Sequence, residues 1–199
     1  MAYISRRKCK MWVKIIVASI PAGVVGILWD DVFTKYFYNY QTVAIMLILV
    51  GIVFIFVERA NKNKVARVDS IDDISYGQAF LIGVFQMIAA IFPGTSRSGS
   101  TIVGSLMLGI SRTAAAEFTF FLAVPAMFGG SAIKILKYSG GFNSAEVALL
   151  AIGMIVAFVL SIIAIKFLMS YIKKHDFKVF GWYRIVLGIA VIGYFLATR

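Results

Sequence analysis

Residues 93–101 of the chain read Pro-Gly-Thr-Ser-Arg-Ser-Gly-Ser-Thr, a polar loop between two apolar stretches. The arginine of this loop, Arg97, is the only charged residue between Asp73 and Arg112. A lone arginine in apolar sequence is energetically costly and usually marks a functional position. Guanidinium, hydroxyl and backbone N–H groups at the start of a helix together form an anion site. The stretch therefore predicts a site that binds phosphate.

The sequence around this loop predicts a hairpin of two helices. Residues 75–78 (Ser-Tyr-Gly-Gln) have the form of a capping box, so a helix is expected to begin near Tyr76 and to end near Phe92. The apolar pattern restarts at Ile102 but rises only about 14 Å before it ends, which is too short to cross a bilayer. Residues 75–111 are therefore expected to form a re-entrant helix–loop–half-helix hairpin, which enters the membrane and turns back.

The composition is that of an integral membrane protein. The chain has 199 residues, of which 61% are hydrophobic and 15% charged, and its mean hydropathy is +0.90. Its apolar runs predict an all-α fold with about five transmembrane helices besides the hairpin, in a single membrane domain of residues 1–199. Loops are expected at residues 30–40, 58–73, 134–141 and 166–178. The predicted spans are residues 13–29, 42–57, 114–133, 147–165 and 180–198, the third broken at Pro125 and Gly129–Gly130.

The net charge of +11 is better explained by a membrane than by nucleic acid. The basic residues form short clusters between apolar runs, at the N-terminus and within residues 59–67 and 166–178. Such clusters bind lipid headgroups and are typical of the cytoplasmic ends of membrane spans. If all three clusters lie on the cytoplasmic side, the C-terminus lies outside. Cys9 and His175 are the only cysteine and histidine, so the sequence excludes an internal disulfide and a Cys/His zinc site.

Two other phosphate-binding motifs fit the loop less well. Gly94 and Gly99 have the spacing of a Walker A loop, but Ser100 stands where that loop needs a lysine, and a helix is expected before it instead of a strand. A Ser-Arg pair also occurs in phosphatases that use histidines as nucleophile and acid. The only histidine here, His175, lies in a polar and basic segment.

Three segments of the chain resemble the undecaprenyl pyrophosphate phosphatases of the bacterial envelope, the bacitracin-resistance protein family. They are residues 71–80 (IDDISYGQAF), residues 93–101 (PGTSRSGST) and residues 109–125, which contain Gly-Ile-Ser-Arg at their start and Ala-Val-Pro at their end. The resemblance extends more weakly from about Trp12 to the C-terminus. The PGxSRSGxT signature is long and specific.

This resemblance implies an enzyme that hydrolyses undecaprenyl diphosphate to undecaprenyl phosphate and phosphate, which recycles the lipid carrier of peptidoglycan synthesis. It implies an inverted-repeat helical bundle in the bacterial cytoplasmic membrane, a divalent cation (Mg²⁺ or Ca²⁺) as cofactor, and a polyprenyl diphosphate lipid, not nucleic acid, as partner. On matching positions it assigns diphosphate binding and catalysis to Ser96, Arg97 and Thr101. Further substrate contacts are predicted for Gly94, Thr95, Ser98, Gly99 and Gln86.

The chain departs from the family in lacking its N-terminal motif of two glutamates, serines and a histidine. It therefore resembles the C-terminal two-thirds of the family. Gln86, at the corresponding place in the hairpin of this chain, is neutral and cannot act as a general base. The base and the metal are expected from elsewhere, and an N-terminal fragment or a second copy in a homodimer is a candidate partner. Weak or no activity is expected of this polypeptide alone.

Several of these residues have alternative roles. Arg97 either binds two phosphate oxygens through its fork or pairs with Glu117 to hold helices together. Ser96 is a nucleophile or a hydrogen-bond donor, and the donor role is favoured because the sequence shows no neighbouring base. Thr101 is alternatively the N-cap of the half-helix. Glu117 is expected to pair with Arg112 or Arg97, or to hold a metal through water.

A carrier or flippase is the alternative function. Broken helices in the middle of a membrane also mark transport sites, where the same loop would hold a phosphorylated lipid without cleaving it. The two functions differ in the fate of the diphosphate, because only hydrolysis releases phosphate.

Overall fold

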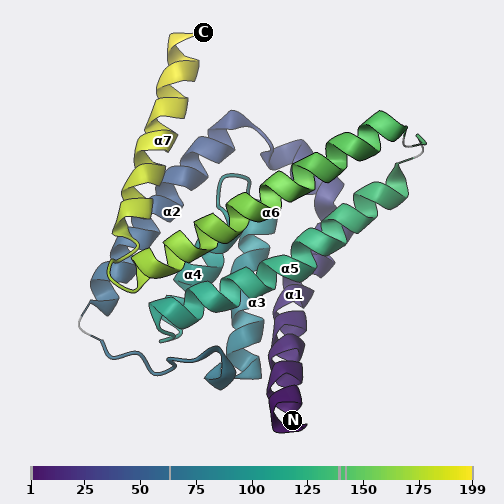
Figure 1. Cartoon of the computed structure of the whole chain (residues 1–199). Helices are drawn as coiled ribbons and strands as arrows, with labels where there is room; N and C mark the ends of the chain where they lie inside the picture. Colours follow the sequence, from purple (N-terminus) through teal and green to yellow (C-terminus); the bar gives the residue numbers. More distant parts are fainter. Residues whose placement is uncertain (1, 63, 139, 142, 199) are drawn as a thin grey trace. The chain divides into compact units, whose positions relative to one another are not determined.

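The chain is built of helices in the computed structural model (Figure 1), which describes residues 2–62, 64–138, 140–141 and 143–198. Within these residues there is no strand, which confirms the all-α fold class. In chain order the elements are α1 (Ala2–Phe37), α2 (Tyr40–Asn61), the short 3₁₀ helix η1 (Ile71–Asp73), α3 (Tyr76–Ile91), α4 (Arg97–Met107), α5 (Arg112–Lys137), α6 (Ser144–Ile172) and α7 (Lys178–Ala197).

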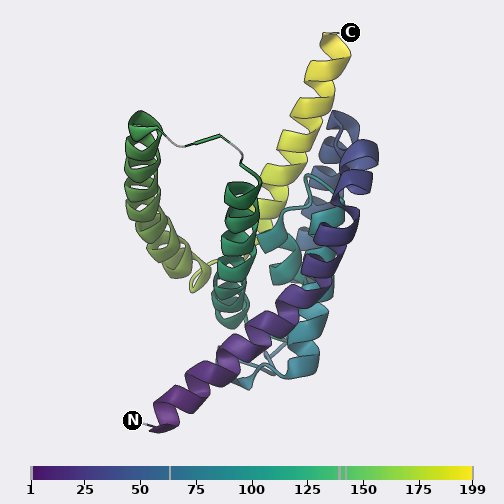
Figure 2. The same cartoon turned by 90° about the vertical axis from the view of Figure 1, so that its right-hand side faces the viewer.

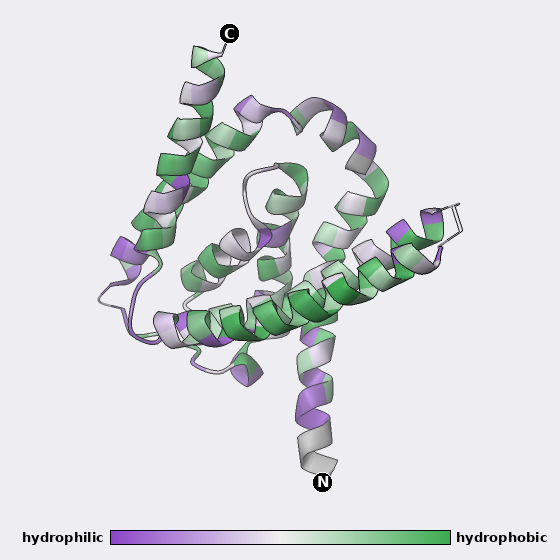
Figure 3. Cartoon of the chain, turned by 45° about the horizontal axis from the view of Figure 1, so that its top comes forward, coloured by the Kyte–Doolittle hydropathy of each residue, from purple (hydrophilic) through white to green (hydrophobic). Residues whose placement is uncertain are grey.

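Five helices are long and apolar enough to cross a membrane, as the sequence predicted. Helices α3 and α4 are shorter, with 16 and 11 residues. Figure 3 shows hydrophobic residues along α6 and hydrophilic residues toward the N-terminal end of α1. The chain is therefore a multi-pass integral membrane protein. The five candidate spans are Arg6–Trp29, Tyr40–Asn61, Arg112–Lys137, Ser144–Ile172 and Lys178–Ala197.

The first helix is longer than predicted. Helix α1 continues to Phe37, so the loop expected at residues 30–40 is mostly helical. No glycine or proline interrupts residues 30–37, so the backbone hydrogen bonding of the helix continues. The turn that follows is short because the side chain of Asn39 accepts a hydrogen bond from the N–H of Thr42 at 2.9 Å and starts α2 at once.

Helices α5 and α6 also extend beyond their predicted ends. Helix α5 continues through Pro125 and Gly129–Gly130 to Lys137, and α6 continues past Lys166 to Ile172. Proline and glycine are tolerated in membrane helices because the surroundings can satisfy the few backbone groups they free. The breaks predicted from these residues are therefore wrong.

Contacts between residues divide the chain into two compact units. One comprises the residues up to Ala126 and from Asp176 onward, and the other comprises residues 127–175. In the first unit α1 packs along α3 and α2 packs along α7 (Figures 1 and 2). In the second unit α6 begins with a capping box between Asn143 and Glu146, and its apolar side chains are exposed, as suits a helix in lipid.

Glycines allow the helices of the first unit to approach closely. A Cβ atom added to Gly83 of α3 would lie 2.3 Å from the carbonyl oxygen of Ala18 in α1. A Cβ atom added to Gly51 of α2 would lie 2.7 Å from the carbonyl oxygen of Gly181 in α7. Small residues at such crossings let two backbones come into contact, which is how membrane helices gain packing energy.

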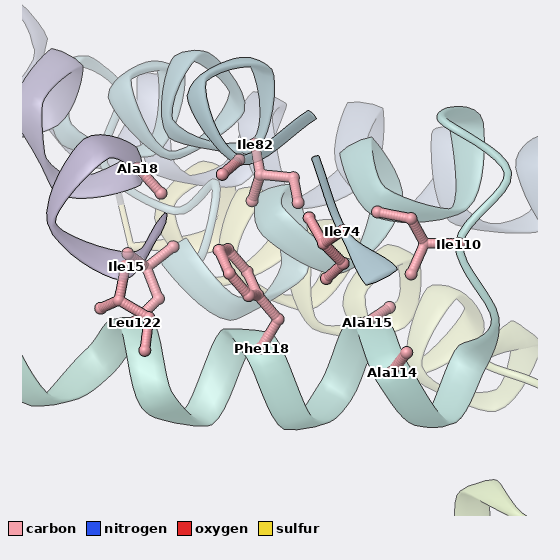
Figure 4. Close-up of a cluster of buried hydrophobic side chains, with 10 residues drawn as sticks. Ile15, Ala18, Ile74, Ile82, Ile110, Ala114, Ala115, Phe118 and Leu122 are labelled. Carbon is pink, nitrogen blue, oxygen red and sulfur yellow. The ribbon is translucent and has the colours of Figure 1, made fainter. Parts of the chain in front are cut away.

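A buried apolar cluster joins α1, α3 and the first turns of α5 (Figure 4). Phe118 of α5 is fully buried at its centre, between Ile15 of α1 and Ile82 of α3. Replacing so large a side chain would leave a costly cavity. The cluster thus fixes the start of α5 against the hairpin that precedes it. Its buried members are Ile15, Ala18, Ile74, Ala79, Ile82, Ile110, Ala114, Ala115, Phe118 and Leu122.

The end of the hairpin is joined to the segment between α2 and α3. The N–H of Arg67 donates to the carbonyl oxygen of Gly109 at 2.8 Å, and the N–H of Ser111 donates to Val68 at 2.8 Å. Gly109 has a φ of +79°, which residues other than glycine rarely adopt. These bonds hold the turn between α4 and α5 in place.

Candidate functional site

The loop between α3 and α4 turns sharply at two residues. Helix α3 begins at the predicted capping box, in which the hydroxyl of Ser75 accepts from the N–H of Gln78, and it ends at Ile91. Gly94 has a φ of +88° and Ser96 a φ of +62°. A positive φ at serine is a strained conformation, and such strain concentrates at functional sites.

The loop packs directly against α2. A Cβ atom added to Gly94 would lie 2.5 Å from the carbonyl oxygen of Val43, and one added to Gly99 would lie 3.2 Å from the ring of Phe54. Gly94 is therefore required by its close approach to the backbone of α2, whereas a side chain at Gly99 would need the ring of Phe54 to shift. Their predicted substrate contacts remain predictions, since the geometry gives them a packing role.

Ser96 is the N-cap of α4. Its Oγ accepts a hydrogen bond from the N–H of Gly99 at 3.3 Å and lies 3.3 Å from the Oγ of Ser98. Helix α4 thus begins at Arg97 and not near Ile102, because the serine hydroxyl satisfies one of the free N–H groups of the first turn, that of Gly99. The polar residues 97–101 belong to the helix, so the N-cap role considered for Thr101 is wrong.

Arg97 lies in the first turn of α4 with an exposed side chain. Within the described residues its guanidinium makes no ion pair and no hydrogen bond, and the expected pair with Glu117 does not form. A cation at the N-terminus of a helix is unfavourable by itself, because both carry positive charge. The arrangement is favourable when an anion lies between the guanidinium and the helix start.

Arg184 of α7 is a second arginine at this loop, which the sequence analysis did not assign to the site. Its Nη1 donates to the carbonyl oxygens of Gly94 and Thr95, each at 3.4 Å, and its side chain is half-buried. A Cβ atom added to Gly99 would lie 3.4 Å from its Nη2. The sequence contains a feature that indicates this role, because Arg184 is the only charged residue between Lys178 and Arg199 and a lone charge in an apolar span usually marks a functional position.

Thr101 lies inside the first turns of α4 and is 1% exposed. Its Oγ1 is 3.1 Å from the carbonyl oxygens of Arg97 and Ser98 and 2.9 Å from the Oγ1 of Thr119 in α5. The hydroxyl of Thr101 is therefore already hydrogen-bonded within the protein. A direct contact of Thr101 with substrate remains a prediction.

Two buried polar side chains of the hairpin have no hydrogen bond within the described parts of the chain. Thr95 is 1% exposed, and its Oγ1 has no partner. Gln86 of α3 is 5% exposed and its amide makes no hydrogen bond there, but within the described residues only Thr95 Oγ1 is a fully buried side-chain atom without a partner. Unpaired buried polar groups are rare and call for a water or a ligand. Both positions were predicted to contact substrate, and that role stays a prediction.

Glu117 does not form the ion pair that was expected with Arg112. Arg112 instead binds Glu58 of α2, with Nε 3.1 Å from both carboxylate oxygens and Nη2 2.5 Å from Oε2. Glu117 is partly exposed and has no ion pair among the residues that the structure describes. The expected structural pairing of Glu117 is therefore wrong.

The donors around the loop suit an anion better than a metal cation. The guanidinium of Arg184 binds the loop carbonyl groups, Ser96 and Ser98 carry hydroxyls beside it, and Arg97 opens α4. Over the described ranges, no three side chains of His, Cys, Asp or Glu gather into a metal-binding group. Divalent cations in phosphate sites prefer carboxylate oxygens, so the residues of this loop do not by themselves fit such an ion.

The fold and the loop together define a class: a multi-pass α-helical membrane protein with a loop rich in glycine and hydroxyl groups at the start of a short helix. The chain belongs to the family described as Bacitracin resistance protein BacA, which matches residues 2–190. This confirms the family resemblance inferred from the three segments.

The chain is similar to several curated bacterial proteins that are named undecaprenyl-diphosphatase. The chain is 63% identical over 194 residues to "Undecaprenyl-diphosphatase" of Desulfitobacterium hafniense, covering 98% of this chain and 70% of the relative. It is 59% identical over 194 residues to "Undecaprenyl-diphosphatase 1" of Clostridium acetobutylicum, covering 98% and 71%. It is 58% identical over 182 residues to "Undecaprenyl-diphosphatase" of Enterococcus faecalis, covering 92% and 66%.

Proposed function

We propose that the chain acts as an undecaprenyl-diphosphatase, which hydrolyses undecaprenyl diphosphate to undecaprenyl phosphate and phosphate. The observation that carries this proposal is the strained loop before α4, with an unpaired Arg97 beside the free N–H groups of the helix. The names of the similar relatives support the same activity. They give no support to the alternative of a carrier or flippase.

Charge neutralisation is the main contribution of this chain to the reaction. Water attacks the terminal phosphorus, the bond to the bridging oxygen breaks, and the lipid phosphate leaves with the electron pair. Arg97 can bind two oxygens of the diphosphate at once, and the N-terminus of α4 supplies N–H donors and a positive dipole. Arg184 binds the carbonyl groups of Gly94 and Thr95 and so holds the loop that precedes α4 in place.

Ser96 can donate to the same phosphate. Because its Oγ accepts the N–H of Gly99, its proton stays free for a phosphate oxygen. Ser98, whose side chain is exposed next to it, can donate in the same way. A nucleophilic serine would need an adjacent base, and no such base lies beside Ser96 in the described residues, so the donor role is the one proposed.

A divalent cation, Mg²⁺ or Ca²⁺, is proposed as the cofactor on the basis of the family resemblance. When bound, such an ion neutralises phosphate oxygens. Its carboxylate ligands and the general base would come from outside the loop, from an N-terminal fragment or from a second copy of the chain. Localisation in the bacterial cytoplasmic membrane and a role in recycling the peptidoglycan lipid carrier are proposed together with the activity.

The proposal is tested by phosphate release from purified protein in detergent. Undecaprenyl diphosphate and the shorter farnesyl diphosphate are supplied with Mg²⁺, with Ca²⁺ or with EDTA, and the Desulfitobacterium hafniense relative serves as positive control. Weak or no release is expected of the chain alone, and release that depends on the cation is expected once an N-terminal fragment of the Desulfitobacterium hafniense relative is co-expressed with it. Transfer of intact diphosphate across vesicles without phosphate release would favour the carrier and contradict the proposal.

Replacement of Ser96 by glycine should separate stability from activity. Glycine adopts the φ of +62° without strain, so the free energy of unfolding should rise by about 1 kcal/mol despite the weaker cap. Loss of the hydroxyl should lower kcat/KM for phosphate release by about 10- to 100-fold, the effect of one hydrogen bond to a charged group. Thermal unfolding and phosphate release measure the two effects.

The same substitution at Ser105 provides the control. Ser105 lies within α4, where glycine lowers helix stability, so Ser105→Gly should lower the unfolding temperature. If Ser96→Gly destabilises the protein as much as Ser105→Gly does, the strain attributed to Ser96 is not present.

A further inference from the structure

The hydrogen bond between Thr101 and Thr119 links the anion site to α5. The two Oγ1 atoms lie 2.9 Å apart, and the residues are 1% and 6% exposed. Across the described part of the chain, the hydroxyl of Thr119 has no other hydrogen-bond partner. A buried hydroxyl that does not donate loses free energy. The proton of Thr119 therefore points to the Oγ1 of Thr101.

This direction decides where the proton of Thr101 goes. An oxygen that accepts from Thr119 is free to donate its own proton to a carbonyl group. The carbonyl oxygens of Arg97 and Ser98 both lie 3.1 Å from it. The hydroxyls thus form a chain from Thr119 through Thr101 to the backbone of the first turn of α4. That turn carries the guanidinium of Arg97 and the hydroxyl of Ser98.

We propose that Thr119 is a positioning residue of the anion site, which holds the first turn of α4 in place through Thr101. The inference rests on the proposed function, since its effect is seen in hydrolysis. Helix α5 is a firm support, because Phe118 next to Thr119 is fully buried in the apolar cluster. A site whose groups are fixed before the substrate binds needs less reorganisation in the transition state.

A purely structural role makes a different prediction. If Thr119 only fills space, a side chain of the same shape should serve equally well, and valine is such a side chain without the hydroxyl. If the hydroxyl is what matters, valine should fail, and serine, which keeps the hydroxyl and loses a methyl group, should succeed. The two substitutions therefore have opposite outcomes under the two roles.

The experiment compares Thr119→Val, Thr119→Ser and the control Thr113→Val in the full chain. Thr113 also lies in α5, and its hydroxyl makes no hydrogen bond within the described residues. Thr119→Val should lower kcat for phosphate release about tenfold with KM little changed, which is less than the ~100-fold expected of a 1 Å misplacement. Thr119→Ser should stay within about twofold of the original chain, and Thr113→Val should not change.

Hydrogen exchange gives a second readout that does not depend on activity. The amides of residues 97–101 should exchange faster in Thr119→Val, return to normal in Thr119→Ser and stay unchanged in Thr113→Val. Equal activity and equal exchange in Thr119→Val and the original chain would overturn the inference. So would a loss in Thr119→Ser as large as that in Thr119→Val.

The two proposals fail in distinguishable ways. If the chain releases no phosphate even when an N-terminal fragment of the Desulfitobacterium hafniense relative is co-expressed with it, while the whole relative does, the proposed function of the chain fails. The exchange measurement then still decides whether Thr119 holds the first turn of α4. Phosphate release by a double variant, Thr101→Val with Thr119→Val, tests the link between the two residues. If the fold-loss of kcat in the double variant equals the product of the fold-losses in the two single variants, Thr119 acts independently of Thr101 and the inference is wrong.

Discussion

Replacing Arg97 by glutamine is expected to lower kcat/KM for phosphate release by about 10³-fold. The substitution removes the charge and both donors of the fork, and each hydrogen bond to a charged phosphate contributes about 1.5–3 kcal/mol. Two such bonds correspond to roughly 10²- to 10⁴-fold in rate. Arg97→Lys keeps the charge but loses the fork, so its loss should be smaller, about 10- to 100-fold.

Folding should be unaffected by this change. The side chain of Arg97 is exposed and has no partner among the described residues, and surface substitutions of this kind usually change stability by less than about 0.5 kcal/mol. Arg59→Gln is the matched control, since Arg59 is an exposed arginine near the end of α2. Full activity in Arg97→Gln, or an equal loss in Arg59→Gln, would show that Arg97 does not bind the diphosphate.

Replacing Glu58 by alanine should cause the largest loss of stability, about 2–3 kcal/mol. Glu58 is 1% exposed, binds Arg112 through both oxygens and accepts the N–H of Phe177 at 3.1 Å. Removing one partner of a buried pair costs about 3–5 kcal/mol. The expected value is lower because the side chain of Arg112 is 38% exposed and can be hydrated. Thermal and denaturant unfolding in detergent measure the effect.

The pair between Arg7 and Asp72 supplies the comparison. Both side chains are partly exposed, so Asp72→Asn should cost at most about 1 kcal/mol. If Glu58→Ala costs no more than Asp72→Asn, the buried pair does not hold the ends of α2, α5 and α7 together.

The local structure of the hairpin could be predicted from the sequence. The capping box at Ser75 fixed the start of α3, and Pro93 with Gly94 marked its end, because these signals act over a few neighbouring residues. The start of α4 was missed. Ser96 caps that helix with a positive φ, a strained conformation that tertiary packing maintains and that sequence patterns do not reveal.

The charged contacts were harder to predict because they depend on packing between distant segments. Arg112 was assigned to Glu117, which is near in sequence, but its partner is Glu58 of α2. Arg184 was not predicted at the site, because its contact with the loop depends on the close approach of α2 and α7. A pattern of residues in one segment carries no information about which other segment lies beside it.

The contact of Gly51 with Gly181 has a geometric consequence for Arg184. The two backbones are in contact, with the side chains of Ile185 and Ile55 packed beside them, so rotating or sliding α7 against α2 would bring backbone atoms into collision. Inserting a single residue between Gly181 and Arg184 would swing the guanidinium by ~100° around the helix axis and carry it away from the carbonyl groups it now binds. The spacing of three positions between the glycine and the arginine is therefore as much a part of the site as the arginine itself.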